Sequence, residues 1–475
     1  MIFSTYKFIF FFLPITFAGY YTLNRFRFFS LAKVWLVVCS LYFYSQGSPA
    51  FFPFFLGSIT GNYIIGSKMI QMEGETKIQR KLLLAVGLAG NIGLLGYYKY
   101  TDFFIENYNL LTGSDVALKH IVLPIGISFF TFQLIAYLVD CYRQEMSQYD
   151  FVNYLLFITF FPQLIVGPII HHSEVVPQFE NENNLKLNLD NISLGLFLFS
   201  IGCAKKILLA DPMTTDAQSF FNHIPESANI LTTWFSSLEY TISYYFDLSG
   251  YADMAIGLGC LFNIRIPQNF DSPYKARNFQ DYWKRWHMTL SRFLSAYIFR
   301  SVYKKESPWR NYYVATMVTF LVSGFWHGAG WTFVVWGIVN GLLVCAASWM
   351  KRKGMSFPFW IAFPLTALGV VLCRVLFVAD SFADVWTVYR GMVNFRSLGS
   401  SVKEALSSIW FFIRWHRSSG LRLVVSAAIC WFLPNSKYMG EHFQPKVRTM
   451  LFASVIMLLC LLNMNKVVQF LYFQF

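Results

Sequence analysis

Charged residues are scarce in this sequence. Only 13% of the 475 residues are Asp, Glu, Lys or Arg, whereas soluble domains average about 25%. Hydrophobic residues make up 56% of the chain and form continuous runs such as 82–95 and 450–462. Helices satisfy their own backbone hydrogen bonds in lipid, and the alternating strands of a membrane barrel do not produce such runs. The sequence therefore predicts an all-α polytopic membrane protein.

Several motifs of soluble enzymes and metal sites are missing. The eight cysteines are scattered, with no C-x-x-C pair and no zinc spacing, so we expect buried free thiols and no metal site. G-x-S-x-G, P-loop and H-E-x-x-H patterns are also absent. The net charge of +13 does not predict nucleic-acid binding, because Lys and Arg cluster between apolar runs and no separate basic domain exists.

The apolar runs suggest ten to twelve crossings of the bilayer, some made by short helices that enter and return. The run 229–262 is long enough for a span plus a broken or tilted piece. Two prolines predict a helix break within 161–169. Lys205 and Lys206 predict a cytoplasmic loop. No internal repeat divides the chain, so we expect one integral-membrane domain over 1–475.

Two histidines, each preceded by a tryptophan, are the main candidates for chemistry. His327 lies in an apolar, glycine-rich run, where an ionisable group is costly and is usually retained for function. A histidine hydrogen-bonded between helices is the structural alternative. A neutral imidazole there is suited to general-base catalysis. The neighbouring glycines would leave room for a substrate, whereas Gly337 and Gly341 would allow close helix packing.

His287 lies in a basic and aromatic segment, Tyr282–Phe299, which we expect to form one amphipathic interfacial helix. The segment is either a membrane anchor or a cationic rim that attracts a phosphate-bearing donor. In the second case Lys284 and Arg285 would bind donor phosphates. Trp286 and Trp326 would line a channel.

Other polar groups in apolar surroundings are weaker candidates. Asp247 and Asp253 are interpreted as helix-capping and inter-helix hydrogen-bonding groups rather than an acid–base pair. His171 and His172 are adjacent, so on a helix they would point in different directions, and we expect neither to be catalytic.

Sequence blocks along almost the whole chain resemble those of the membrane-bound O-acyltransferase (MBOAT) family. Within that family the likeness is to the bacterial alginate O-acetyltransferase membrane subunit and its relatives. The blocks that carry it are Leu123–Phe132, Phe161–Ile169, Asp247–Gly259, Pro267–Tyr274, Trp286–Ser291, Gly324–Thr332 and the closing Phe470–Phe475.

This resemblance implies a ring of tilted helices, with short and re-entrant helices, around a central funnel. It implies that His327 is the catalytic histidine and His287 the second functional one. The donor would be acetyl-coenzyme A, with no bound cofactor and no metal. The acceptor would be a surface polysaccharide, reached through a periplasmic or extracellular transferase partner. The location would be the bacterial inner membrane.

Three functions remain open at this point. The first is transfer of acetyl to an alginate-like exopolysaccharide, cellulose or peptidoglycan. The second is D-alanyl or other acyl transfer to a cell-wall polymer, which a more distant branch of the family performs. The third is a proton-coupled transporter without acyl chemistry, because such proteins also carry intramembrane histidines.

Overall fold

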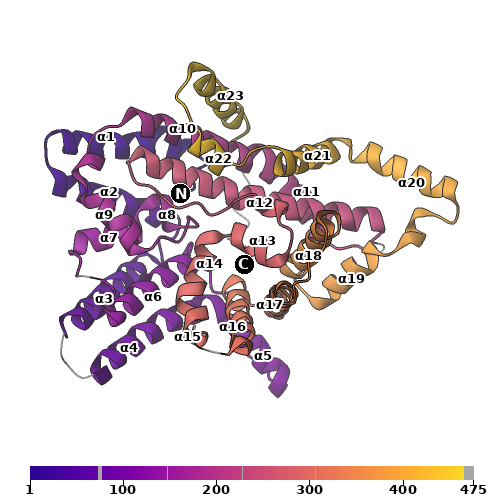
Figure 1. Cartoon of the computed structure of the whole chain (residues 1–475), viewed down its shortest axis with the longest axis horizontal. Coiled ribbons are helices and arrows are strands. Elements are labelled where there is room, and N and C mark those ends of the chain that lie inside the picture. The colour runs from indigo at the N-terminus through magenta and orange to yellow at the C-terminus, as the bar shows by residue number, and fades with distance from the viewer. Residues whose placement is uncertain (73–76, 147, 227, 305, 307, 465–475) are drawn as a thin grey trace. The chain divides into compact units, whose positions relative to one another are not determined.

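The computed structural model is mainly helical over the residues that it describes, which are 1–72, 77–146, 148–226, 228–304, 306 and 308–464 (Figure 1). No strand occurs in these ranges. The all-α fold class is thus confirmed. The closing block 470–475 lies outside the described residues.

The chain forms two compact units built from interleaved segments. The first contains Met1–Ser200, Tyr251–Gln268 and Gln444–Val455, and the second contains Ile201–Gly250, Asn269–Phe443 and the segment from Ile456. Because each unit draws on distant parts of the sequence, this division is not a cut between two consecutive domains. The single domain over 1–475 stays a prediction, as does the ring around a funnel.

The first unit holds the N-terminal helices. They are η1 (Phe8–Phe12), α1 (Leu13–Arg25), α2 (Phe29–Ser45), α3 (Phe52–Gln71), α4 (Lys77–Leu95), η2 (Gly96–Tyr100), α5 (Thr101–Thr112), α6 (Ile127–Arg143), α7 (Phe151–Thr159), α8 (Phe161–Leu164), α9 (His172–Glu180), η3 (Glu182–Leu185) and most of α10 (Leu189–Cys203). Helices α3, α4 and α6 pack side by side (Figure 1). The predicted break within 161–169 is confirmed, since α8 ends at Leu164 and α9 begins only at His172.

The second unit holds the elements that carry the two candidate histidines. They are η4 (Ala204–Ala210), α11 (Asp211–Phe221), η5 (Pro273–Lys275), α13 (Phe279–Arg285), α14 (Met288–Leu294), η6 (Ser295–Phe299), α15 (Arg300–Val302), α16 (Trp309–His327), α17 (Trp331–Arg352), α18 (Phe359–Val378), α19 (Phe382–Met392), η7 (Phe395–Leu398), α20 (Val402–Trp415), α21 (Arg417–Phe432) and α22 (Ser436–Glu441). Helices α12 (Ile230–Leu261) and α23 (Val447–Asn463) have residues in both units.

Helix α12 accounts for the long run 229–262, which was interpreted as a span plus a broken or tilted piece. The helix is continuous over 32 residues, or roughly 48 Å at 1.5 Å per residue, so a broken piece is wrong and the tilt stays a prediction. Its glycines explain how neighbouring backbone packs against it. A Cβ on Gly257 would lie 2.6 Å from the Gly195 carbonyl oxygen, and a Cβ on Gly250 would lie 2.8 Å from that of Gly202. Small residues at such contacts let membrane helices approach closely.

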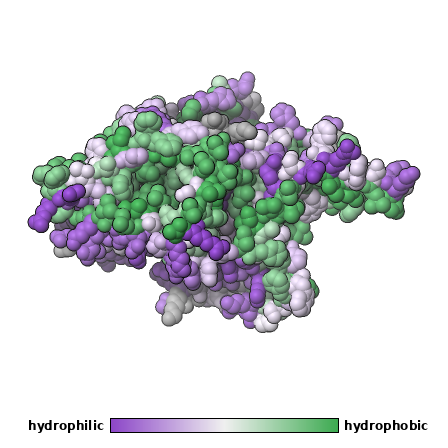
Figure 2. All heavy atoms as spheres, turned by 90° about the horizontal axis from the view of Figure 1, so that it is seen from above, coloured by the Kyte–Doolittle hydropathy of each residue, from purple (hydrophilic) through white to green (hydrophobic). Residues whose placement is uncertain are grey.

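Hydrophobic surface is extensive, as expected of a chain in lipid. Figure 2 shows hydrophobic residues over much of the face in view, with hydrophilic residues gathered mainly along its borders. Within the described residues, four helical stretches are long and apolar enough to span a membrane: 77–112, 189–221, 331–352 and 359–378. Helices α2 and α23 are apolar but shorter. The larger number of ten to twelve crossings stays a prediction.

Candidate active site

His287 occupies a sharp turn between α13 and α14. Its backbone has φ 46° and ψ 52°, the left-handed conformation that non-glycine residues adopt at a cost of about 1–2 kcal/mol. The expected single helix Tyr282–Phe299 is therefore wrong. The chain breaks at Trp286 and His287 and turns π-helical at Ser295. The amphipathic pattern of the sequence did not reveal this break, because basic and aromatic residues continue on both sides of it.

A neighbouring extended segment holds the strained turn. The Asp271 N–H donates to the Arg285 carbonyl, and the Met288 N–H donates to the Asn269 carbonyl, each at 2.9 Å. The Asn269 side-chain oxygen also accepts from the Thr289 hydroxyl at 2.9 Å. These bonds fix the backbone on both sides of His287. These hydrogen bonds hold the backbone of His287 at its positive φ. Strained backbone that is held in this way is typical of functional positions.

Asp271 is in turn anchored to α22 and the residue before it. Its carboxylate accepts from Lys437 Nζ at 2.8 Å and from Asn435 Nδ2 at 2.7 Å. Burial acts to raise the pKa of Asp271, but hydrogen bonds from Lys437 and Asn435 and the charges of Lys437 and Arg285 outweigh it. The pKa therefore lies below its ordinary value of 3.8.

His327 is the last residue of α16, at the start of a Gly-Ala-Gly turn into α17. Close packing of α16 and α17 depends on glycine. A Cβ on Gly324 would lie 2.5 Å from the Phe333 carbonyl oxygen, and a Cβ on Gly337 would lie 2.5 Å from that of Phe320. The packing role expected of Gly337 is confirmed. The room for substrate expected at the glycines near His327 is not seen at Gly324 or Gly328, because a Cβ on Gly328 would meet the Phe333 ring at 2.1 Å.

Aromatic rings surround both histidines. The indole of Trp326 lies against both, with ring centroids 4.9 Å from His327 and 6.4 Å from His287. Trp336 and Phe377 contact His327 at 5.1 and 5.4 Å, each nearly perpendicular to the imidazole. Both histidines are buried, His287 to 2% exposure and His327 to 4%. The structure thus brings the two predicted histidines into one aromatic cluster.

Arg374 is the residue that sequence reasoning missed. It lies on α18, is 5% exposed, and places its guanidinium carbon 4.2 Å from the ring centroid of Tyr244, 5.1 Å from that of Trp286 and 5.2 Å from that of Phe377. Within the described residues, its Nε has no hydrogen-bond partner. The signal was present, since Arg374 is the one charged residue in the apolar run 357–378, and such residues usually mark function.

The remaining predicted residues differ in their surroundings. Trp286 is buried between Tyr282 and Tyr244, with centroids 5.6 and 5.9 Å away and nearly parallel planes. Lys284 is exposed. Arg285 is part-buried and donates to Asp281 at 2.9 Å. The channel and phosphate roles given to these residues stay predictions.

The family is shown by comparison with known proteins. The model of the membrane-bound O-acyltransferase (MBOAT) family matches residues 3–379. The chain is a member of this family. It is therefore an O-acyltransferase, and the family match and the apolar helices make it a multi-pass membrane protein.

The relatives of this MBOAT chain have names that refer to peptidoglycan, alginate and teichoic acid. It is 42% identical over 437 residues to a peptidoglycan O-acetyltransferase from Helicobacter pylori, covering 85% of this chain and 82% of the relative. It is 35% identical over 404 residues to the probable alginate O-acetylase AlgI of Pseudomonas putida, covering 83% and 81%. A teichoic acid D-alanyltransferase from Streptococcus thermophilus matches at 26%, over 48% of this chain and 58% of the relative.

A buried ion cluster in this MBOAT chain corrects two further predictions. Lys206 Nζ lies 2.7 Å from Asp211 and 2.6 Å from Asp247, and all three side chains are at most 5% exposed. Lys205 and Lys206 both lie in the π-helix η4. The cytoplasmic loop predicted for them is therefore wrong. Asp247 lies mid-helix in α12, so it caps nothing, but its expected inter-helix contact is confirmed.

An apolar cavity of about 70 Å³ lies beside the aromatic cluster of this MBOAT chain. Tyr274, Tyr282, Thr366 and Cys430 are among its lining residues, and neither histidine is. The cavity is small for a drug-sized ligand, whose pockets measure about 300–1,000 Å³. The funnel toward the histidines stays a prediction.

Proposed function

We propose that this MBOAT protein takes acetyl from cytoplasmic acetyl-coenzyme A and passes it across the bacterial inner membrane for O-acetylation of a surface glycan. Peptidoglycan is the first acceptor to test, because the 42% identity with a peptidoglycan O-acetyltransferase covers 85% of this chain. The alginate relative, at 35%, makes an exopolysaccharide the next acceptor.

The observation that carries this proposal is the burial of His287 and His327 against one indole in a chain of this family. In the proposed reaction an acceptor hydroxyl oxygen attacks the thioester carbonyl carbon, and His327 takes the hydroxyl proton. The tetrahedral intermediate then expels the coenzyme A thiolate, which receives the proton back from His327. The products are an acetyl ester and free thiol, so atoms and charge balance.

His287 is proposed to position the donor or assist proton movement. The cost of its left-handed backbone supports a functional role, since strain of this kind is retained where the surroundings over-determine it. Arg374 adds a buried positive charge stacked on Trp286 and Phe377, the second of which contacts His327. We propose that this charge stabilises negative charge on the donor or on the developing oxyanion.

Moving only the acyl group has a physical reason. Coenzyme A carries phosphates whose transfer into hydrocarbon is very costly, so the donor would stay on the cytoplasmic side, with Lys284 and Arg285 near its phosphates. An extracytoplasmic transferase partner would complete delivery to the polymer. The match to a teichoic acid D-alanyltransferase makes D-alanyl transfer the second candidate.

The test compares cells that lack the native gene and carry wild type, His327→Ala or His223→Ala at matched membrane protein levels. His223 is an exposed histidine and serves as the control. Alkali-released acetate and D-alanine are measured on each isolated surface polymer. We expect acetate to disappear from one glycan with His327→Ala alone. Loss of D-alanine instead would establish the second candidate, and no change in either would contradict acyl transfer.

A further inference from the structure

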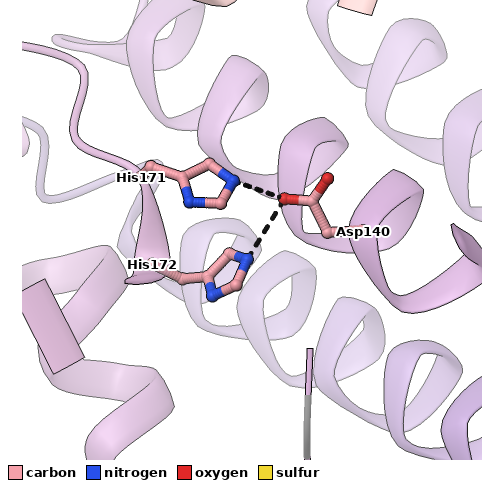
Figure 3. Close-up of side chains that lie close together, drawn as sticks. All are labelled: Asp140, His171 and His172. Carbon is pink, nitrogen blue, oxygen red and sulfur yellow. Dashed lines mark hydrogen bonds and ion pairs between the residues drawn. The ribbon is translucent and has the colours of Figure 1, made fainter. Parts of the chain in front are cut away.

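Three side chains outside the aromatic cluster converge on one point in the first unit. Asp140 lies on α6, His171 is the N-cap residue of α9, and His172 is the first residue of that helix. The Nε2 atoms of His171 and His172 lie 2.9 and 3.2 Å from the same Asp140 oxygen, Oδ2 (Figure 3). The two imidazoles were predicted to point in different directions. They do not, because the pair begins a helix instead of lying within one.

Each histidine is also held at its other ring nitrogen. Nδ1 of His172 lies 2.9 Å from the Tyr149 hydroxyl oxygen, and Nδ1 of His171 lies 2.6 Å from the Ser173 hydroxyl oxygen. Metal-binding histidines almost always have such an oxygen partner on the nitrogen that does not bind the metal. The arrangement leaves both Nε2 atoms directed at Asp140, as Figure 3 shows.

The burial of the cluster suits a cation that keeps one open position. The Asp140 and His172 side chains are 1% and 3% exposed, whereas that of His171 is 36% exposed. Buried carboxylates are commonly paired with cations or bound to metals, and a dication at Oδ2 would be such a partner. The exposed side at His171 would admit the cation and a water ligand.

We propose that Asp140, His171 and His172 bind a divalent first-row transition cation, with Zn²⁺ the first to test. Two imidazoles and one carboxylate are the ligands found in several open zinc sites. The three ligand atoms lie within 4.8 Å of one another. Tetrahedral zinc with bonds of about 2.0–2.1 Å separates its ligands by about 3.3 Å, close to the 2.9 and 3.2 Å observed. The cation would join α6 to the start of α9.

The sequence predicted no metal site, because its cysteines and histidines lack the regular spacing of zinc ligands. Here two ligands are adjacent and the third is 31 residues earlier on another helix. The competing arrangement is a metal-free cluster in which the Nε2–H groups of both histidines donate hydrogen bonds to Asp140. The Ser173 N–H at 3.4 Å from His171 Nδ1 fits that tautomer. Metal content separates the two arrangements.

The experiment uses full-length protein in detergent, purified with a tag that contains no histidine. The protein is offered Zn²⁺, passed through a desalting column and analysed for metals by mass spectrometry. Wild type is compared with His171→Ala and Asp140→Asn, and with His442→Ala, an exposed histidine outside the cluster. We expect about one cation per chain in wild type and His442→Ala, and nearly none in the two cluster variants.

His171→Ala is the decisive variant, because His171 is part-exposed and its loss leaves the buried pair intact. Monodisperse elution in gel filtration shows that it is folded. In wild type and His442→Ala, but not in the two cluster variants, Co²⁺ should give the visible absorption of a cation with nitrogen ligands, and a chelator should lower the Tm. Wild type without metal after exposure to Zn²⁺, or equal metal in folded His171→Ala, would overturn the proposal. The proposal does not rest on acyl transfer: His327→Ala should keep its cation.

Discussion

His287 and His327 are 40 positions apart in the sequence, yet both imidazoles lie against the indole of Trp326. One histidine comes from a strained turn and the other from the end of a glycine-packed helix pair. The turn therefore positions the imidazole of His287, and the helix pair positions that of His327. The role of each histidine can be tested without changing the other.

The left-handed turn allows the imidazole of His287 to be separated from its backbone. His287→Gly relieves a backbone strain of about 1–2 kcal/mol but also leaves a cavity where the buried imidazole packed, so its Tm should fall less than that of His287→Ala, while acetyl transfer is lost in both. The matched control is His120→Gly, since His120 is exposed and has the same φ of 46°. The control should be as stable as wild type and fully active. Full activity in His287→Gly would show that the backbone, not the imidazole, is what the site needs.

Arg374 tests whether a buried charge serves the reaction. Arg374→Gln should lower kcat/KM for acetyl transfer at least about tenfold, which corresponds to the loss of about 1.5–3 kcal/mol from one charged hydrogen bond. Arg390→Gln is the control, because Arg390 also stacks on an indole, that of Trp386 at 5.0 Å, but is exposed. A change in KM alone would place the charge at the donor. A change in kcat would place it at the developing oxyanion. Unchanged kinetics in a folded variant would remove Arg374 from the site.

The buried ion cluster predicts a large difference between two adjacent lysines. Lys206→Met leaves Asp211 and Asp247 buried beside each other without this cation, which costs about 3–5 kcal/mol. Lys205→Met removes a part-buried hydrogen bond to Ser436 and a contact with the Tyr245 ring, but leaves Lys206 beside the two carboxylates. Thermal unfolding in detergent should show a much lower Tm, or no folded protein, for the first variant alone. Equal Tm values would mean that Lys206 does not compensate the two carboxylates.

Asp271 predicts a pH dependence confined to acid. Its pKa is lowered on folding, so its stabilising contribution is present above the ordinary value of 3.8 and is lost as the pH falls through the lower folded value. The Tm difference between wild type and Asp271→Asn should be constant from about pH 5 to 8 and should shrink below about pH 4. A difference that grows in acid would reverse the assigned sign.

The sequence predicted the features that depend on residue type. The membrane class follows from the scarcity of charge, and His327 was singled out because an ionisable group in an apolar run is rare. Features that depend on where a helix stops were missed. The amphipathic pattern continued through His287, where the chain turns, and the charge rule could not distinguish Lys206, buried between two carboxylates, from a lysine in a cytoplasmic loop.

Two errors had the most consequence for chemistry, and a helix end explains the first of them. His171 and His172 were judged as if inside a helix, but at its start both reach one Asp140 oxygen. The second error is the omission of Arg374, although the argument that singled out His327 in an apolar run applies equally to an arginine inside a membrane helix.

The most direct test of the central claim follows label in inverted inner-membrane vesicles, whose cytoplasmic face is outside. Acetyl-labelled coenzyme A is added to vesicles that contain wild type, His327→Ala or His223→Ala, together with glycan acceptor and the periplasmic proteins of the same cells, which include the proposed transferase partner, in the lumen. The account predicts alkali-labile label on luminal glycan with wild type and His223→Ala, and none with His327→Ala. Equal labelling with His327→Ala would contradict the role of His327 as the base that drives acetyl transfer.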